Sequence, residues 1–431
     1  MRRSQRLIIM LLLICCSAAV NCCIANAAVK TSIKKGVFTV YGTGKMQSSQ
    51  IVKGKNRLKI KKVVIKKGVT SIPAYAFKNC ANVKSIKIAS TVKTIGRCAF
   101  WGDSSVKTIT IPSKVKVINE FLFKNCKNLK SVKMRGDFIV DKETGAEGDR
   151  CCLHADTFIF STPLDIANVN YLDTNNIEVC VDDTYFKSID GVVYSKSGKD
   201  LVRVPSRRKE LKVAEGCENI AISALNYVED TYIDGPGHFA CCQLRKLTLP
   251  ATVKNVSFDL YPDILSSHSS GRIHPECPRT DIIEVNGIDD LNGESFSNLL
   301  YVVSGGTVIR MIDEAEQKGY ITRNGNLTIY KGNHLVMLKA DEEEEKIAIP
   351  DSIISIGAGA IDHQTIYDRY NEEKEGDRVT YTKIHIGTLD VGKNVKSIGR
   401  DAFSCERSFY TKTQIDNIVL HDRDLYYDLY I

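Results

Sequence analysis

The chain has 431 residues, with 59 Lys and Arg, 51 Asp and Glu, and a formal net charge of +8. Hydrophobic residues make up 43% and charged residues 26%, which is close to the average for globular proteins and excludes wholesale disorder, a coiled coil, collagen and a polytopic membrane protein. The length alone suggests two or three domains of about 150 residues each.

Residues 1–27 are predicted to be a secretory signal peptide. Three arginines precede an uncharged apolar run of fourteen residues, Leu7–Val20, and a small-x-small cleavage pattern follows at Ala25–Ala27. A membrane anchor is the alternative, but this run falls short of the roughly 20 residues needed to span a bilayer. We therefore expect a secreted or extracellular chain, either free or held at the cell surface, without a membrane span after cleavage.

Apolar residues then recur every 23 residues. Paired apolar residues two positions apart point to one face of a short strand, and a coil of this length can bury them only against a neighbouring coil. The period predicts a stack of coils whose strands pair in parallel. The positions that define it are Val69, Val92 and Val115; Ile72, Ile95 and Ile118; Phe77, Phe100 and Phe123; and Ile86, Ile109 and Val132.

The repeat unit reads V-x-x-I-x-x-x-A-F-x-x-C-x-x-L-x-x-I-x-I-P, and its phase returns around residues 211–225, 244–253, 347–361 and 389–403. It resembles the BspA-like class of leucine-rich repeats, which is common in surface and secreted proteins of bacteria. The resemblance implies a leucine-rich repeat solenoid, with a parallel β-sheet on one face, short turns or helical segments on the other, and β-hairpin insertions.

Further segments fit this resemblance as an N-terminal strand and two β-hairpins, namely Val37–Met46, Ser188–Pro205 and Tyr320–Leu338. Thr307–Lys318 is predicted to be a helix, because one face carries Val308, Ile309, Ile312 and Ala315. The acidic run Asp341–Glu345 is expected to be a solvated loop, or to take part in self-association.

These signals divide the chain into seven predicted segments. They are the signal peptide at 1–27, an N-terminal strand and cap at 28–57, regular repeats at 58–137, an insertion with a β-hairpin at 138–210, degenerate repeats at 211–303, a helix and second hairpin at 304–346, and C-terminal repeats at 347–431.

No motif for catalysis, cofactor binding or a metal site is evident. The eight histidines form no H-x-x-x-H or H-E-x-x-H pattern, and the chain after residue 27 contains no C-x-x-C. The sequence also lacks a G-x-S-x-G elbow and a glycine-rich phosphate loop. The adjacent pairs Cys151–Cys152 and Cys241–Cys242 can ligate a metal or form vicinal disulfides, or place one thiol inward and one outward. We predict no cofactor and no metal.

Cys80 and Cys126 occupy one repeat position, and Asp103 occupies it in the coil between them. Small buried residues are expected there, because free cysteine packs like a small hydrophobe. A disulfide would have to cross a whole coil, about 9–10 Å, which exceeds the Cα separation of about 7 Å that such a bond allows.

The cations are concentrated in the first coils. Residues 28–134 hold 24 Lys and Arg against Asp103 and Glu120, a net +22, whereas residues 135–431 hold 32 against 49 acids, a net −17. Six of these cations fall in register, and we call them the lysine ladder: Lys61, Lys84, Lys107 and Lys130 at one repeat position, and Lys87 and Lys133 in the outward slot of the strand, with Thr110 between them.

Like charges on strands about 4.8 Å apart repel each other. The lysine ladder is therefore either the binding site of an anionic ligand or a lysine-rich surface that only confers solubility. Together with the signal peptide and the solenoid, it favours a secreted or surface-displayed binding or adhesion protein that is not an enzyme. The expected partner is a protein or an anionic polysaccharide at the cell surface or on a host, and the predicted export excludes intracellular nucleic acid.

Two other functions are compatible with the sequence. One is an enzyme with accessory repeats, whose catalytic residues lie in the 138–187 insertion, where His154 is the candidate. The other is a structural component of a surface assembly, for which self-association of the basic and acidic parts would be the mechanism.

Overall fold

The structure is a computed structural model that describes residues 28–119, 121–141, 153–166, 169, 172–225, 243–257, 282–303, 305–340, 343–361, 382–403 and 411–422. The predicted signal peptide and the two adjacent cysteine pairs lie outside the described residues. The described residues fall into two compact units, one within 28–184 and one within 185–422. Among them, no helix combines the length and apolar character that crossing a membrane requires.

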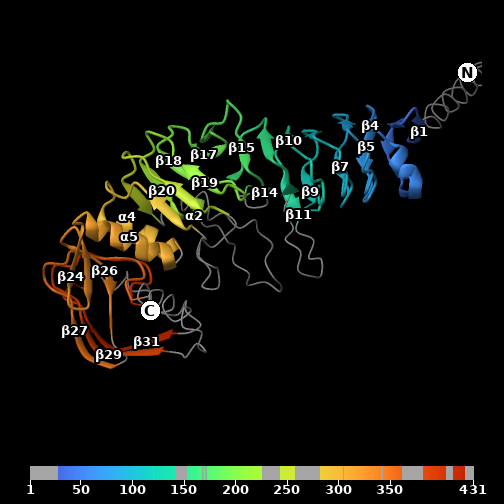
Figure 1. The fold of residues 1–431 in the computed structure, drawn as a ribbon. Helices are drawn as coiled ribbons and strands as arrows, with labels where there is room; N and C mark the ends of the chain where they lie inside the picture. The colour runs from blue at the N-terminus through green and yellow to red at the C-terminus, as the bar shows by residue number, and fades with distance from the viewer. Residues whose placement is uncertain are drawn as a thin grey trace, which may run out of the picture. The chain divides into compact units, whose positions relative to one another are not determined.

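The first unit is a stack of coils, and each coil contributes one strand to a parallel arrangement (Figure 1). Residues 23 positions apart face each other across neighbouring strands, as in Val63 opposite Ile86 and Ile109 opposite Val132. This register confirms the predicted repeat. The strands are β4 (Lys62–Ile65), β6 (Ser85–Ile88), β8 (Thr108–Ile111) and β10 (Ser131–Met134), and the antiparallel hairpin of β1 (Lys30–Lys34) and β2 (Val37–Tyr41) precedes them.

A second set of short parallel strands runs through the V-x-x-I segments of the repeat unit. Val69 and Ile72 are both buried at the ends of such a segment, so the chain between them is extended and pairs with its neighbours. These strands are β3 (Gly44–Lys45), β5 (Val69–Ile72), β7 (Thr94–Ile95), β9 (Val117–Asn119) and β11 (Ile139–Asp141).

Aromatic side chains fill the interior of the regular coils. Phe100 is 1% exposed and stacks between Phe77 and Phe123, with ring centroids 5.8 and 6.1 Å away. Cys80 and Cys126 are buried free thiols, as predicted.

Residues 153–178 correct the predicted insertion, because they continue the stack. Ser131 on β10 faces Thr157, which in turn faces Asn176, all in parallel register. The successive spacings are 26 and 19 residues instead of 23, so the 23-residue phase does not reveal these coils. Their strands are β12 (Leu153–His154), β13 (Thr157–Phe160), β14 (Leu172–Asp173) and β15 (Asn176–Glu178).

The second unit opens with the antiparallel hairpin expected within 188–205 and then returns to parallel pairing. One sheet contains β16 (Phe186–Ile189), β17 (Val192–Ser195), β18 (Asp200–Arg203), β20 (Asn219–Ala221) and β22 (Asn255–Ser257). Another contains β19 (Glu210–Lys212), β21 (Lys246–Thr248) and β23 (Glu284–Asn286). The short helix α2 (Ile222–Leu225) follows β20.

The pattern repeats in the last part of this unit. The second predicted hairpin is present and leads into a five-stranded sheet of β24 (Ile321–Asn324), β25 (Leu327–Tyr330), β26 (His334–Leu338), β28 (Ser355–Ile356) and β30 (Ser397–Ile398). A parallel three-stranded sheet contains β27 (Glu343–Ala348), β29 (Thr382–Asp390) and β31 (Thr411–Val419).

Glu343–Glu345 lie in strand β27, so the prediction of a solvated loop for the acidic run is wrong for these residues. The segment is extended because Ile347 is buried and β27 pairs with β29. A cross-strand contact also offsets part of the negative charge, since a carboxylate oxygen of Glu343 lies 2.7 Å from Nδ1 of His385.

Helix α5 (Gly305–Gln317) matches the predicted helix, with Val308, Ile312 and Ala315 buried and Ile309 half-buried. Helix α4 (Gly293–Val302) was not predicted from the sequence. Asn292 begins it as an N-cap, since its side-chain oxygen accepts a hydrogen bond from the amide of Ser295 at 2.8 Å.

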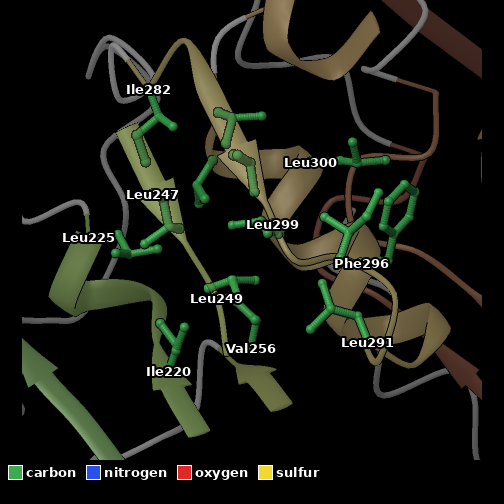
Figure 2. Close-up of a cluster of buried hydrophobic side chains, with 14 of the residues drawn as sticks. Ile220, Leu225, Leu247, Leu249, Val256, Ile282, Leu291, Phe296, Leu299 and Leu300 are labelled. Atoms are coloured by element: carbon green, nitrogen blue, oxygen red, sulfur yellow. The ribbon is translucent and has the colours of Figure 1, made fainter. Parts of the chain in front are cut away.

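Helix α4 closes the edge of the sheet at β22 with side chains instead of a strand. The Ser295 hydroxyl accepts from the Val256 amide at 3.0 Å and donates to the Lys254 carbonyl at 3.0 Å, and the Asn298 side chain donates to the Val256 carbonyl at 2.8 Å. Phe296, together with Leu299 and Leu300 of the same helix, belongs to the buried cluster with strand residues such as Leu247 (Figure 2). The helix side chains thereby satisfy backbone N–H and C=O groups at the β22 edge that would otherwise pair with a further strand.

Candidate functional site

The lysine ladder lies on the outward side of the main-sheet strands of the first unit. Lys84 directly precedes β6, and its amide donates to the Lys61 carbonyl at 2.9 Å, while the Lys130 amide donates to the Lys107 carbonyl at 2.7 Å. The structure thus places these lysines on neighbouring coils in register. All six side chains of the ladder are exposed.

The outward slot of the strands alternates between cationic and neutral residues. Lys87 faces Val64 across the β4–β6 pair, and Lys133 faces Thr110 across the β8–β10 pair. A neutral neighbour therefore stands beside each of these two lysines. At the first ladder position there is no such spacer, because Lys61, Lys84, Lys107 and Lys130 occupy four consecutive coils.

No carboxylate forms an ion pair with the ladder within the described coils, and the acid that follows it in register is Asp156, at the ladder position of the coil after Lys130. None of the six ladder lysines forms an ion pair with another described residue. Asp103 is 0% exposed, and burial raises the pKa of its carboxyl to about 9, so it is uncharged at neutral pH. Glu120, the other acid of residues 28–134, lies outside the described residues.

In the second unit, the residues that directly precede β19, β21 and β23 are Lys209, Arg245 and Ile283, so two unspaced cations recur at the ladder position. The next position, which is the first residue of each strand, carries both signs of charge. Glu210, Lys246 and Glu284 face one another across β19, β21 and β23, and the Lys246 ammonium lies 2.6 Å from the Glu284 carboxylate. Opposite charges on neighbouring strands attract. The two units therefore differ at this first strand position, where the first unit has Ser85, Thr108 and Ser131 in place of opposite charges.

At another repeat position of the first unit, an aromatic residue separates two lysines. The indole ring of Trp101 lies between the ammonium groups of Lys78 and Lys124 on the two adjoining coils, at 4.0 and 5.1 Å from the ring centroid. Cation–π attraction replaces like-charge repulsion at this turn. The lysine ladder lacks such a device at its first position.

His154, the candidate residue of the enzyme hypothesis, pairs with Asp173 on the neighbouring coil. Its Nδ1 lies 2.6 Å from a carboxylate oxygen of Asp173, and both side chains are partly exposed. A carboxylate that orients a histidine is one part of a catalytic triad, but the arrangement also needs a nucleophile. This contact links the two neighbouring coils that contain the paired strands β12 and β14.

A buried serine–histidine–serine chain lies in the second unit. His334 on β26 is 3% exposed, with Nε2 at 2.8 Å from the Ser297 hydroxyl of α4 and Nδ1 at 2.6 Å from the Ser355 hydroxyl of β28. Burial lowers the pKa of His334 to about 4, so the imidazole is neutral at pH 7. Because Ser297 is 0% exposed, substrate cannot reach it in this conformation, and the chain ties α4 to the following repeats.

The stability of the second unit is expected to fall in acid because of His334. Its folded pKa is depressed from 6.5 to about 4, so its contribution is complete above pH 6.5 and is lost as the pH falls towards 4. The expected loss is about 1.4 kcal/mol per pH unit, roughly 3 kcal/mol in all. Hydrogen exchange of peptides from α4 and β26 between pH 7 and 4 measures it. His334→Gln should flatten the profile, and an unchanged acid slope in that variant would contradict the assignment.

The sequence reasoning missed a row of hydroxyl residues beside the lysine ladder. Ser85 and Ser131 are half-buried and Thr108 is exposed, all at the same strand position, one residue after a ladder lysine. The 23-residue phase already contained this signal, since K-S/T recurs in three successive coils. Among the described residues, no group of three or more His, Cys, Asp or Glu side chains is placed to hold a metal ion.

Residues 55–142 match a family model described as BspA type leucine rich repeat region, with six copies. This match covers the regular coils and the whole lysine ladder, and it confirms the resemblance of the repeat unit. The coils of this segment are leucine-rich repeats of the BspA type. Curated proteins include none with a significant sequence match to the chain.

Three solved structures are similar over most of the chain. A leucine-rich repeat protein from Eubacterium ventriosum is 14% identical, with a TM-score of 0.29 and 92% of this chain and 84% of that chain covered. A leucine rich cell surface protein from Faecalibacterium prausnitzii is 15% identical, with a TM-score of 0.26 and coverages of 93% and 95%. The pneumococcal vaccine antigen PcpA is 12% identical, with a TM-score of 0.27 and coverages of 91% and 86%. Since these TM-scores are low, the solenoid assignment rests on the strand pairings and the repeat match.

Proposed function

We propose that this protein is a secreted or cell-surface binding and adhesion scaffold, without catalytic activity, whose lysine ladder binds an anionic protein or polysaccharide. The observation that carries the proposal is the run of four lysines on consecutive coils, with no spacer and no carboxylate partner among the described residues. Such a run costs stability through repulsion, so a ligand that neutralises it gains the same energy back on binding.

The physical consequence is strong and salt-sensitive attraction. Aligned cations on one face raise the local concentration of anions and speed their association. Added salt screens exposed charges, with a Debye length of about 10 Å at 0.1 M and 3 Å at 1 M. Binding that depends on the ladder must therefore weaken steeply with ionic strength.

Removing three ladder charges is expected to weaken the binding of a polyanion at low salt by about tenfold or more, which corresponds to only 1.4 kcal/mol over three charges. The variant is Lys84→Gln, Lys107→Gln and Lys130→Gln, and the measurement is calorimetric or surface binding of heparin and poly-glutamate across a salt series.

A matched control separates the ladder from bulk charge. Lys93→Gln, Lys114→Gln and Lys127→Gln remove the same net charge from exposed residues outside the main-sheet strands of the same coils. This control should keep most of the wild-type affinity. Equal losses in the two variants would show that only net charge matters, and no binding of wild-type protein at low salt would refute the proposal.

A further inference from the structure

We infer that the ligand of the lysine ladder is a linear acidic polysaccharide that lies across the coils, along the direction in which they stack. This inference rests on the proposed function and narrows its ligand from anionic macromolecules in general. It is carried by three rows of side chains on the strand pairs β4–β6 and β8–β10, of which the middle row begins at β6, since Lys62 holds its position on β4.

The first row contains the unspaced lysines that directly precede the strands, and the third is the outward slot that includes Lys87 and Lys133. Between them lies the hydroxyl row, which we define as Ser85, Thr108 and Ser131. These three hydroxyls have no side-chain hydrogen-bond partner among the described residues. Each can therefore donate one hydrogen bond and accept others from a ligand.

The chemistry of the middle row distinguishes a polysaccharide from other polyanions. Sugars present hydroxyl groups that donate and accept, so they can pair with the hydroxyl row while their acidic groups meet the lysines on either side. Polyphosphate has no neutral donors for this row, and an acidic polypeptide carries its charges on flexible side chains. Neutral hydrogen bonds add a modest gain in affinity and give directionality that charge alone lacks.

A folded protein partner fits this face poorly. Protein interfaces depend on a few buried anchors, mostly Trp, Tyr and Arg, seated in apolar pockets. The outward positions of these four strands hold Lys, Ser and Thr, and Val64 is their one apolar residue. This hydrophilic surface matches a ligand held by repeated weak contacts.

The regular spacing indicates a linear ligand. Parallel strands stand about 4.8 Å apart, so cations recur with this period along the stack. A polymer whose acidic groups repeat along its length can meet several of them at once. Affinity should then rise with oligosaccharide length until the ladder is covered, and should rise no further beyond that.

The test compares a hydroxyl-row variant, Ser85→Ala, Thr108→Val and Ser131→Ala, with the wild-type chain. The probes are heparin oligosaccharides of fixed length, poly-glutamate and polyphosphate at matched charge and salt. We expect the variant to lose about tenfold in affinity for the oligosaccharides, since three hydrogen bonds are removed. Its affinity for poly-glutamate and polyphosphate should stay within about twofold of wild type, since no charge changes.

A gain-of-binding variant complements this loss. Thr110→Lys completes the outward slot between Lys87 and Lys133 and should tighten heparin binding several-fold, which misfolding cannot mimic. The fluorescence of Trp101, the one tryptophan of the chain, verifies that each variant melts like the wild type.

The possible outcomes separate this inference from the proposed function. If poly-glutamate or polyphosphate binds as tightly as the oligosaccharides, or the hydroxyl-row variant weakens all probes equally, the polysaccharide inference is overturned and the basic binding face remains. If no polyanion binds the wild-type chain at low salt, both are overturned.

Discussion

Replacing Phe100 by alanine is expected to destabilise the first unit by about 3–5 kcal/mol, as in other truncations of buried phenylalanine. The ring is 1% exposed and stacks on Phe77 and Phe123, so its removal leaves a cavity that touches three coils. In a stacked repeat each coil is stabilised by its neighbours, and a defect in the middle coil weakens the interfaces on both sides. Urea unfolding followed by Trp101 fluorescence measures the change.

Two companion variants define what this result means. Phe100→Leu keeps most of the apolar volume and should cost clearly less than the alanine variant. Lys93→Ala removes an exposed side chain from the same coil and should change stability by less than about 0.5 kcal/mol. A loss below about 1 kcal/mol for Phe100→Ala would mean that the ring is not buried and that the repeat phase is misassigned.

The regular coils could be predicted from sequence because their apolar positions repeat without error. Val63 and Ile86 pair in the structure at the spacing that the sequence shows, and the register follows from burying one face of each strand. The coils at 153–178 could not be found in this way. Their spacing of 19 residues keeps the strand pairing but shortens the turn, and a fixed period does not detect such a change.

Helix α4 escaped prediction for a different reason. Its segment, Gly293–Val302, carries Ser295, Ser297 and Asn298, which are weak helix formers in isolation. Those polar residues are buried because they hydrogen-bond to β22 and to His334. Such a helix is specified by its tertiary partners, and local propensity contains little of that information.

The candidate site shows the same division. The positions of the ladder lysines could be predicted, because a repeat fixes which residues point outward. It could not be predicted whether carboxylates neutralise these lysines, since that depends on where acids from other parts of the chain lie. The ion pair of Lys246 with Glu284 in the second unit likewise emerged only from the structure.

The repeat therefore has two consequences for function. Interior positions such as Phe100 stack because identical side chains pack well at the strand spacing. Exterior positions repeat at the same spacing, so a single favoured residue type becomes a row. A row of lysines is costly for the folded chain, and this cost is what a polyanionic ligand relieves.

Asp103 interrupts the interior and is expected to make the first unit less stable as the pH rises. It occupies the repeat position of Cys80 and Cys126, where one carboxyl oxygen accepts from the Cys80 amide at 2.9 Å and the other has no hydrogen-bond partner. Burial, only partly opposed by Arg57, raises its pKa from 3.8 to about 9. The unfolded chain ionises above pH 3.8 while the folded chain keeps the proton. The stabilising contribution is thus complete below pH 3.8 and is lost as the pH rises to 9, by about 1.4 kcal/mol per unit.

Asp103→Cys is therefore expected to stabilise the first unit by roughly 4–6 kcal/mol at pH 8, and by only about 1–2 kcal/mol at pH 5. A thiol suits this repeat position. In the next coil Cys126 occupies it, and its thiol donates a hydrogen bond to the Phe100 carbonyl at 3.0 Å. Urea unfolding monitored by Trp101 fluorescence at pH 5, 6.5 and 8 measures the difference. Asp103→Asn, which cannot ionise, should share the flat pH profile. Parallel profiles of wild type and Asp103→Asn would instead show that the folded chain holds Asp103 as a carboxylate, with Arg57 as its counter-ion.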